Sequence, residues 1–178
     1  MVLSASSVVA EANYGSAWFF FERQVLWTLL GIATFVVAAR VDYRKWRRLA
    51  LPLLLVSAAL LVLVLVPGVG IHVDGATRWL GVGSLRFQPT EVAKLALLLF
   101  SADLLTRRAR DLHDWRLVVA PVLVVLAILA VLVLRQPDLD STIVLGLIAF
   151  TSLIVGGVRM RHLAALGLAG LTLPAVLA

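Results

Sequence analysis

The chain has 178 residues, of which 62% are hydrophobic, and its mean hydropathy is +1.03. A soluble domain is usually about 45–50% apolar, so this composition predicts an integral membrane protein. The absence of cysteine excludes a disulfide framework or a thiolate metal site, and the three histidines are widely separated. The net charge of +6 does not indicate nucleic-acid binding, because the basic residues form no stripe interleaved with aromatic side chains.

The apolar segments predict an all-α fold, a polytopic helical bundle forming one transmembrane domain over 1–178. Residues 1–10 are too few to cross about 30 Å of hydrocarbon, so we expect the end of a helix whose beginning is missing. Six spans follow, the last of which stops with the sequence: 24–39, 49–66, 89–106, 117–134, 141–158 and 163–178.

The basic residues predict the orientation of these spans. Most of the sixteen Lys and Arg fall in 40–48, 107–116 and 158–162. The positive-inside rule therefore predicts that these three segments are cytoplasmic loops, that 67–88 is a large outer loop, and that the N-terminus is inside.

The segment 74–94 covers most of the outer loop and the start of the next helix. It has more charged and polar residues than a simple connection between two helices needs. Arg78 and Trp79 fit two interpretations equally well: an interfacial anchor, or an anion contact beside a flat apolar surface. Arginine suits phosphate through its forked donors, and Arg86 is a weaker candidate of the same kind.

Glu91 and Lys94 lie at the entrance of an otherwise apolar helix that Pro89 is expected to start. One interpretation is a salt bridge that holds two helices together. Such a pair adds little net stability, and ionisable groups inside a membrane segment usually mark a site. We therefore favour a role in a binding site.

Asp138 and Asp140 lie beside Pro137 at the start of another helix. Ordinary capping explains either one alone, but two carboxylates so close together could also hold a hard divalent cation. Asp103, near the inner end of its helix, is expected to pair with Arg107.

In this order, the motifs resemble the SEDS family (shape, elongation, division and sporulation), the polytopic proteins FtsW and RodA. The run GATRWLGVGSLRFQPTEVAKLALLLF is similar to the family's GARRW…FQPSE-x-AK signature, and RQPDLDSTIVL is similar to its QPDLGTA motif. The openings SASSVVA and FFFERQVLW, the loop AARVDYRKWRRLA and the turn GGVRMRHL match in the same order. The opening and the segment GVGSLRFQP look more like the division member than the elongation member.

The resemblance implies a peptidoglycan glycosyltransferase that polymerises lipid II, an undecaprenyl-diphosphate-linked precursor, at the bacterial cytoplasmic (inner) membrane. It also implies a divalent cation (Mg or Mn), a class B penicillin-binding transpeptidase as partner, and other membrane proteins of the division machinery. The positions that match the family's functional motifs are Trp79, Glu91, Lys94 and Asp138, beside the candidate Arg78.

This sequence departs from the family motifs at three positions. Thr90 replaces the usual Ser and keeps the hydroxyl, whereas Thr77 replaces a frequent Arg and removes a potential phosphate contact. Asp140 replaces the usual Gly and places a second carboxylate beside Asp138, as a tentative cation site.

The resemblance implies ten membrane helices, with the catalytic aspartate in a large outer loop after the seventh. That loop would lie beyond Ala178, so we expect a fragment that is inactive by itself. Two alternatives remain open: a lipid II flippase or other lipid-linked carrier, and a non-catalytic membrane scaffold of the division machinery. A flippase needs ionisable groups along a path to the inner leaflet, whereas here the intramembrane charges cluster near the outer side.

Overall fold

The computed structural model describes residues 18–73, 76–82 and 85–158, and the chain divides into two compact units, residues 1–45 and 46–178. In the first unit, helix α2 (Phe19–Arg40) starts earlier than the predicted span 24–39, because the aromatic run before Gln24 is helical. Its large apolar side chains are exposed, as expected of a helix surrounded by lipid; Phe35, for example, is 73% exposed. The predicted remnant 1–10 and the predicted span 163–178 lie outside the described residues.

Helix α3 (Tyr43–Val64) also starts earlier than predicted. The segment predicted as a loop, 40–48, is helical except at Val41 and Asp42. Arg and Lys are good helix formers, so a run of basic residues does not by itself end a helix. A carboxylate oxygen of Asp42 accepts a hydrogen bond from the backbone N–H of Arg44 (2.8 Å) and so satisfies one donor of the first turn.

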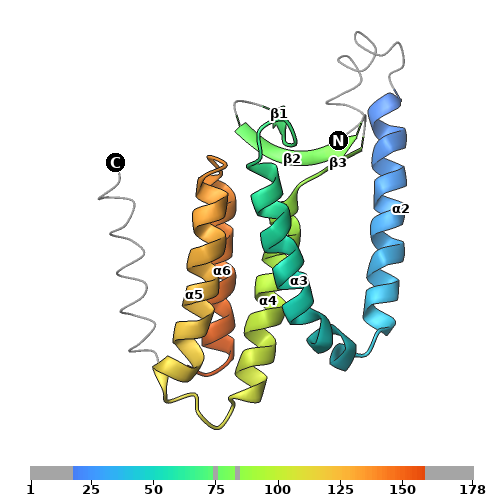
Figure 1. The fold of residues 1–178 in the computed structure, drawn as a ribbon. Helices are drawn as coiled ribbons and strands as arrows, with labels where there is room; N and C mark the ends of the chain where they lie inside the picture. Colours follow the sequence, from blue (N-terminus) through green and yellow to red (C-terminus); the bar gives the residue numbers. More distant parts are fainter. Residues whose placement is uncertain (1–17, 74–75, 83–84, 159–178) are drawn as a thin grey trace. The chain divides into compact units, whose positions relative to one another are not determined.

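Helices α4 (Pro89–Arg107), α5 (Trp115–Leu134) and α6 (Leu139–Val155) closely match three predicted spans. They lie side by side, with α4 and α5 both packed against α6 (Figure 1). Their shared core is aliphatic, and α3 contributes to it through Leu54 and Leu61. Other core residues are Ala93, Ala96, Leu97, Val122, Leu129, Val133, Leu145, Ala149 and Leu153.

The outer faces of these helices are apolar as well. Helices α3 and α5 are long and apolar enough to cross a membrane, yet only 28% of the most apolar 18-residue window of each is buried. The core helix of a soluble protein would be mostly buried. Exposed aliphatic side chains such as Ile143 (62%) and Val155 (82%) are therefore expected on faces that lipid or other apolar surfaces cover.

The predicted outer loop, 67–88, contains a small antiparallel sheet that the sequence analysis did not predict. Strands β1 (Ile71–Val73), β2 (Ala76–Val82) and β3 (Leu85–Phe87) pair in the order β1-β2-β3. The sheet lies across the end of the bundle where α3 ends and α4 begins (Figure 1). Because β3 runs directly into α4, the sheet holds the polar residues of this segment over the helix ends.

Candidate functional site

The polar residues at the sheet end of the bundle converge on one carboxylate, that of Asp138. Asp138 caps the N-terminus of α6, where one side-chain oxygen accepts a hydrogen bond from the Ser141 N–H (3.1 Å). Its other oxygen accepts from Nε2 of Gln88, the residue that precedes α4 (3.1 Å). Nη1 of Arg78, on β2, lies 3.6 Å from the first oxygen. Three segments distant in sequence therefore meet at this side chain.

The Asp138 side chain is buried and has both an oppositely charged partner and hydrogen-bond donors. The side chain is only 2% exposed, and a buried carboxylate is stable only when it is paired and hydrogen-bonded. The Arg78 guanidinium supplies the opposite charge, and the N-terminus of α6 supplies the positive end of a helix dipole. Asp138 is therefore a helix cap, as one interpretation of the sequence expected, and it is also the centre of a polar cluster.

Arg78 remains accessible while it pairs with Asp138. Its side chain is 27% exposed, and a guanidinium has five N–H donors, more than one carboxylate contact uses. Trp79 follows it on the same strand. Ile71 of β1 pairs with Trp79 and His72 pairs with Thr77, so Arg78 is the extra residue of a β-bulge, where the regular alternation of side chains is interrupted. Both interpretations of the Arg78–Trp79 pair therefore stay predictions.

Glu91 and Lys94 form an ion pair within the first turns of α4, with Lys94 Nζ 2.6 Å from a Glu91 carboxylate oxygen. The pair lies within one helix and so does not hold two helices together. Lys94 is 19% exposed and Glu91 62% exposed. The pair thus presents a carboxylate at the surface, bound by a lysine whose side chain is mostly covered.

Asp140 does not join Asp138. It is exposed in the first turn of α6, and residues two apart on a helix do not face each other. Asp138 is also already bound by Arg78, Gln88 and the Ser141 N–H, so little of its oxygen surface is left for a metal ion. Within 18–73, 76–82 and 85–158, no three His, Cys, Asp or Glu side chains lie close enough together to hold a metal ion. These residues by themselves do not fit a closed divalent-cation site.

A comparison with protein families identifies the family of this chain. The family model described as "Cell cycle protein", that of FtsW, RodA and SpoVE, matches residues 1–178. The chain belongs to this family.

Relatives within the FtsW/RodA/SpoVE family cover nearly the whole chain. The chain is 40% identical over 174 residues to a "Probable peptidoglycan glycosyltransferase FtsW" of Geobacter metallireducens, covering 98% of this chain and 46% of that protein. It is 35% identical to the "Stage V sporulation protein E" of Bacillus subtilis, covering 97% of this chain and 47% of that protein. The chain thus spans about half the length of the curated relatives it matches.

Solved structures of the same family share the fold. One, described as "Structural coordination of polymerization and crosslinking by a peptidoglycan synthase complex", aligns with a TM-score of 0.76 and 34% identity over 99% of this chain and 52% of that chain. The rod shape determining protein RodA of Thermus thermophilus aligns with a TM-score of 0.72 and 31% identity, over 99% of this chain and 56% of that chain. The prediction of an all-α, polytopic membrane bundle is confirmed.

Two glutamines belong to this end of the family fold, and the sequence analysis gave neither of them a role. Gln88 binds Asp138, as described above. Gln136, 1% exposed, donates from Nε2 to the backbone carbonyl of Leu61 near the end of α3 (3.2 Å). That carbonyl is free to accept, because the Leu65 N–H bonds to Val62 instead. Each glutamine directly precedes a proline near the start of a helix. That position is the signal in the sequence that could have identified a side chain hydrogen-bonded to a neighbouring element.

Proposed function

We propose that this chain forms part of a peptidoglycan glycosyltransferase that polymerises lipid II, and that the Arg78–Asp138 cluster contributes to binding the substrate diphosphate. Two relatives support the reaction class, since one is named as a peptidoglycan glycosyltransferase and one solved neighbour concerns polymerisation by a peptidoglycan synthase complex. The observation that carries the role of the site is the buried, fully bound Asp138, which positions an accessible arginine on the sheet.

The proposed chemistry follows from the charges at this end. When a glycosyl bond to a diphosphate breaks, negative charge develops on the leaving group, and fixed cationic donors stabilise it. Arg78, oriented by Asp138, and Lys94, oriented by Glu91, would supply such donors. Trp79, the next residue of β2, is proposed to contact the substrate beside Arg78. The divalent cation remains a prediction from the family resemblance, and no step here depends on it.

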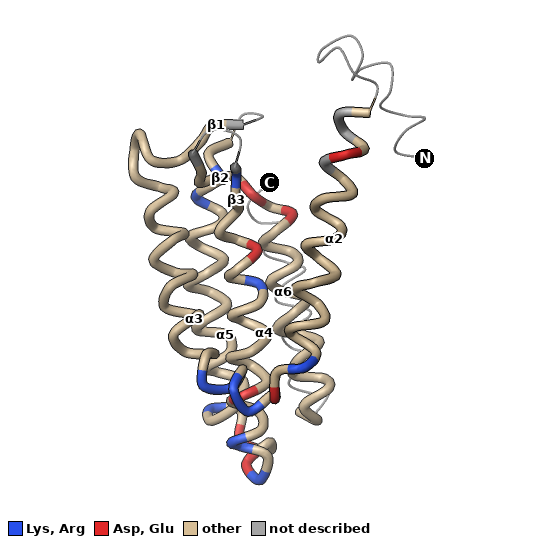
Figure 2. Tube along the Cα trace, turned by 90° about the vertical axis from the view of Figure 1, so that its right-hand side faces the viewer, with Lys and Arg blue, Asp and Glu red and all other residues tan. Residues whose placement is uncertain are grey.

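The location and partner are also proposed. Lys and Arg gather at the bundle end opposite the sheet (Figure 2), which supports a cytoplasmic location for that end by the positive-inside rule, with the sheet outside the cytoplasmic membrane. A cytoplasmic N-terminus remains a prediction from the sequence. A class B penicillin-binding transpeptidase is the proposed partner, in keeping with the coupling of polymerisation and crosslinking described for the solved complex.

A chimera tests this function. Residues 1–178 would replace the matching segment of the Bacillus subtilis relative, and the purified chimera would be assayed for glycan polymer formation from lipid II. We expect polymer from the chimera and about 100-fold less from its Arg78→Gln variant, the loss typical when one charge-stabilising donor is removed. Asp140→Asn, which also removes a charge at the same helix start, serves as the matched control.

The outcomes separate the competing functions. A chimera that inserts and folds but makes no polymer would contradict the enzyme assignment and favour a carrier or a scaffold. A chimera in which Arg78→Gln polymerises as well as the parent would keep the reaction class and remove the proposed role of the site.

A further inference from the structure

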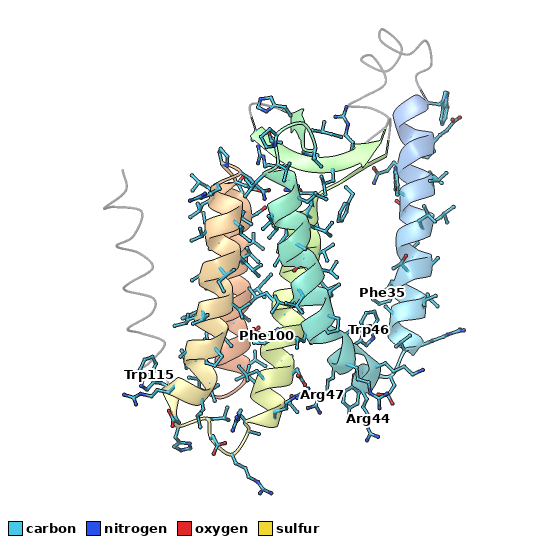
Figure 3. The ribbon with its side chains drawn as sticks, viewed as in Figure 1. Phe35, Arg44, Trp46, Arg47, Phe100 and Trp115 are labelled. Carbon is cyan, nitrogen blue, oxygen red and sulfur yellow. The ribbon has the colours of Figure 1, made fainter. Side chains whose placement is uncertain are left out.

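At the opposite end of the bundle, one carboxylate binds two arginines. Nε of Arg47, on α3, donates to an Asp103 oxygen at 2.7 Å, and Nε of Arg107 lies 2.9 Å from the other oxygen. The pairing of Asp103 with Arg107 was predicted from the sequence, but the contribution of Arg47 was not. Arg47 lies on the part of α3 nearest this end, beside Trp46 (Figure 3).

The triad of Arg47, Asp103 and Arg107 has an excess of positive charge and of hydrogen-bond donors. Two guanidinium groups and one carboxylate carry a net charge of +1. Each guanidinium has five N–H donors, whereas a carboxylate accepts about four hydrogen bonds in all. Asp103 is largely covered, at 13% exposed, whereas Arg47 is 38% and Arg107 63% exposed. One arginine would be enough to join the two helices through Asp103. With the second arginine present, the two exposed guanidinium groups have more N–H donors than the carboxylate can accept.

The depth of the triad along the bundle matches that of lipid headgroups. It lies where the apolar run of α4 ends, and the chain continues into further basic residues, Arg108 and Arg110. Trp115 lies at the same end, at the start of α5, and is 50% exposed (Figure 3). Tryptophan is enriched at the membrane–water interface, so Trp46 and Trp115 mark this level as the headgroup region.

We propose that Arg47 and Arg107, oriented by Asp103, bind the phosphodiester group of an anionic phospholipid in the leaflet at this end of the bundle. A phosphodiester carries one negative charge and neutralises the triad, and its oxygens accept the forked donors of both arginines. Basic pockets between membrane helices on the cytoplasmic side are suited to such headgroups. This site lies at the far end from the proposed diphosphate site, so the proposal goes beyond the glycosyltransferase function.

Native mass spectrometry of the detergent-purified chain, titrated with short-chain phosphatidylglycerol, tests this site. We expect Arg107→Gln and Arg47→Gln each to weaken binding about tenfold, because each removes one charged hydrogen-bond partner. Arg110→Gln is the matched control, since it removes the same charge from the neighbouring loop and is expected to leave the affinity within about twofold. If Arg47→Gln loses its fold by circular dichroism, Arg107→Gln decides, because it leaves the contact between α3 and α4 in place.

Three results would overturn the proposal. Equal weakening by Arg110→Gln would mean that the lipid responds only to the total charge. Equal binding of phosphatidylcholine would mean that an anionic headgroup is not required. Displacement of the lipid by inorganic phosphate at the same concentration would identify a free-anion site instead of a lipid site.

Discussion

Arg78 on strand β2 and Asp138 at the start of α6 form an ion pair, with Arg78 Nη1 3.6 Å from an Asp138 oxygen. The sheet continues directly into α4, where Gln88 binds the same carboxylate. Asp138 therefore ties the sheet and the starts of two helices together, and its substitution should affect all three.

Asp138→Ala should be among the most destabilising single substitutions at this end. It removes the cap of α6, worth about 1 kcal/mol, and leaves Arg78 and Gln88 without a partner, for a total loss of about 2–4 kcal/mol. Asp138→Asn keeps a good capping side chain and should cost less. The midpoint of thermal unfolding in detergent measures both variants, with Asp140→Asn as a control that should lower the midpoint only slightly, because it removes an acid from the first turn of α6. Equal midpoints for Asp138→Ala and Asp140→Asn would contradict the central role of Asp138.

Gln136 allows the hydrogen bond and the burial of its amide to be tested separately. Its Nε2 donates to the Leu61 carbonyl, while its Oε1 is buried with no hydrogen-bond partner among the residues that the structure describes. Gln136→Leu loses a bond but also removes an unsatisfied atom, so the net cost should be at most about 1 kcal/mol. Gln136→Glu keeps the shape but places a carboxylate against the Leu61 carbonyl, and it should destabilise far more. Thermal unfolding midpoints in the order wild type, Leu, Glu are expected; a Glu variant as stable as the Leu variant would rule out this geometry.

The Glu91–Lys94 pair can be tested by charge reversal. Lys94→Glu places two acids three residues apart on α4 and should lower stability, because like charges at this spacing repel. The double variant Glu91→Lys/Lys94→Glu restores an opposite-charge pair and should recover part of the loss. Recovery should be incomplete, because the acid no longer lies in the first turn at the positive end of the helix dipole. A double variant no more stable than Lys94→Glu alone would show that the pair contributes nothing.

Gly70 lies where the chain leaves α3 for the sheet, and a side chain there would meet fixed backbone. An added Cβ would lie 2.7 Å from the Val64 carbonyl oxygen and would also contact the Thr77 methyl group. Gly70→Ala should therefore destabilise the sheet end by about 1–3 kcal/mol, as overpacking typically does. Gly146, inside α6, is the matched control: nothing lies within 4 Å of its added Cβ, so Gly146→Ala should stabilise by up to about 1 kcal/mol. Thermal unfolding shifts of opposite sign are expected.

The helix positions were largely predictable because the apolar runs end at charges and prolines. Helix α4 begins at Pro89 as predicted and ends one residue later than predicted. The start of α3 was missed because the run from Tyr43 to Arg48 was interpreted by its charge, although its residues favour helix. The sheet was missed because 67–88 was interpreted by its polar residues and glycines, which are typical of a loop, and not by the alternation of side chains along a strand.

The site residues were predictable one at a time, but their partners were not. Sequence motifs selected Arg78 and Asp138 separately, yet only the packing of β2 over the start of α6 brings the two side chains together. The same holds for Arg47, which the sequence places among several equivalent basic residues and the structure pairs with Asp103. The predicted cation site at Asp138 and Asp140 stays a prediction, and in the structure Asp138 caps α6 while Asp140 is exposed in its first turn.

Helix α4 carries charges close to both ends of its apolar run. Between Lys94 and Asp103 every residue is uncharged, and at about 1.5 Å per residue this stretch is only about 13 Å long. A bilayer core is about 30 Å thick, so α4 is mismatched to a membrane of ordinary thickness. Contacts with α5, α6 and β2 cover part of α4 and so shield its charged ends from lipid. Where α4 is not covered, the bilayer beside it should be locally thinned.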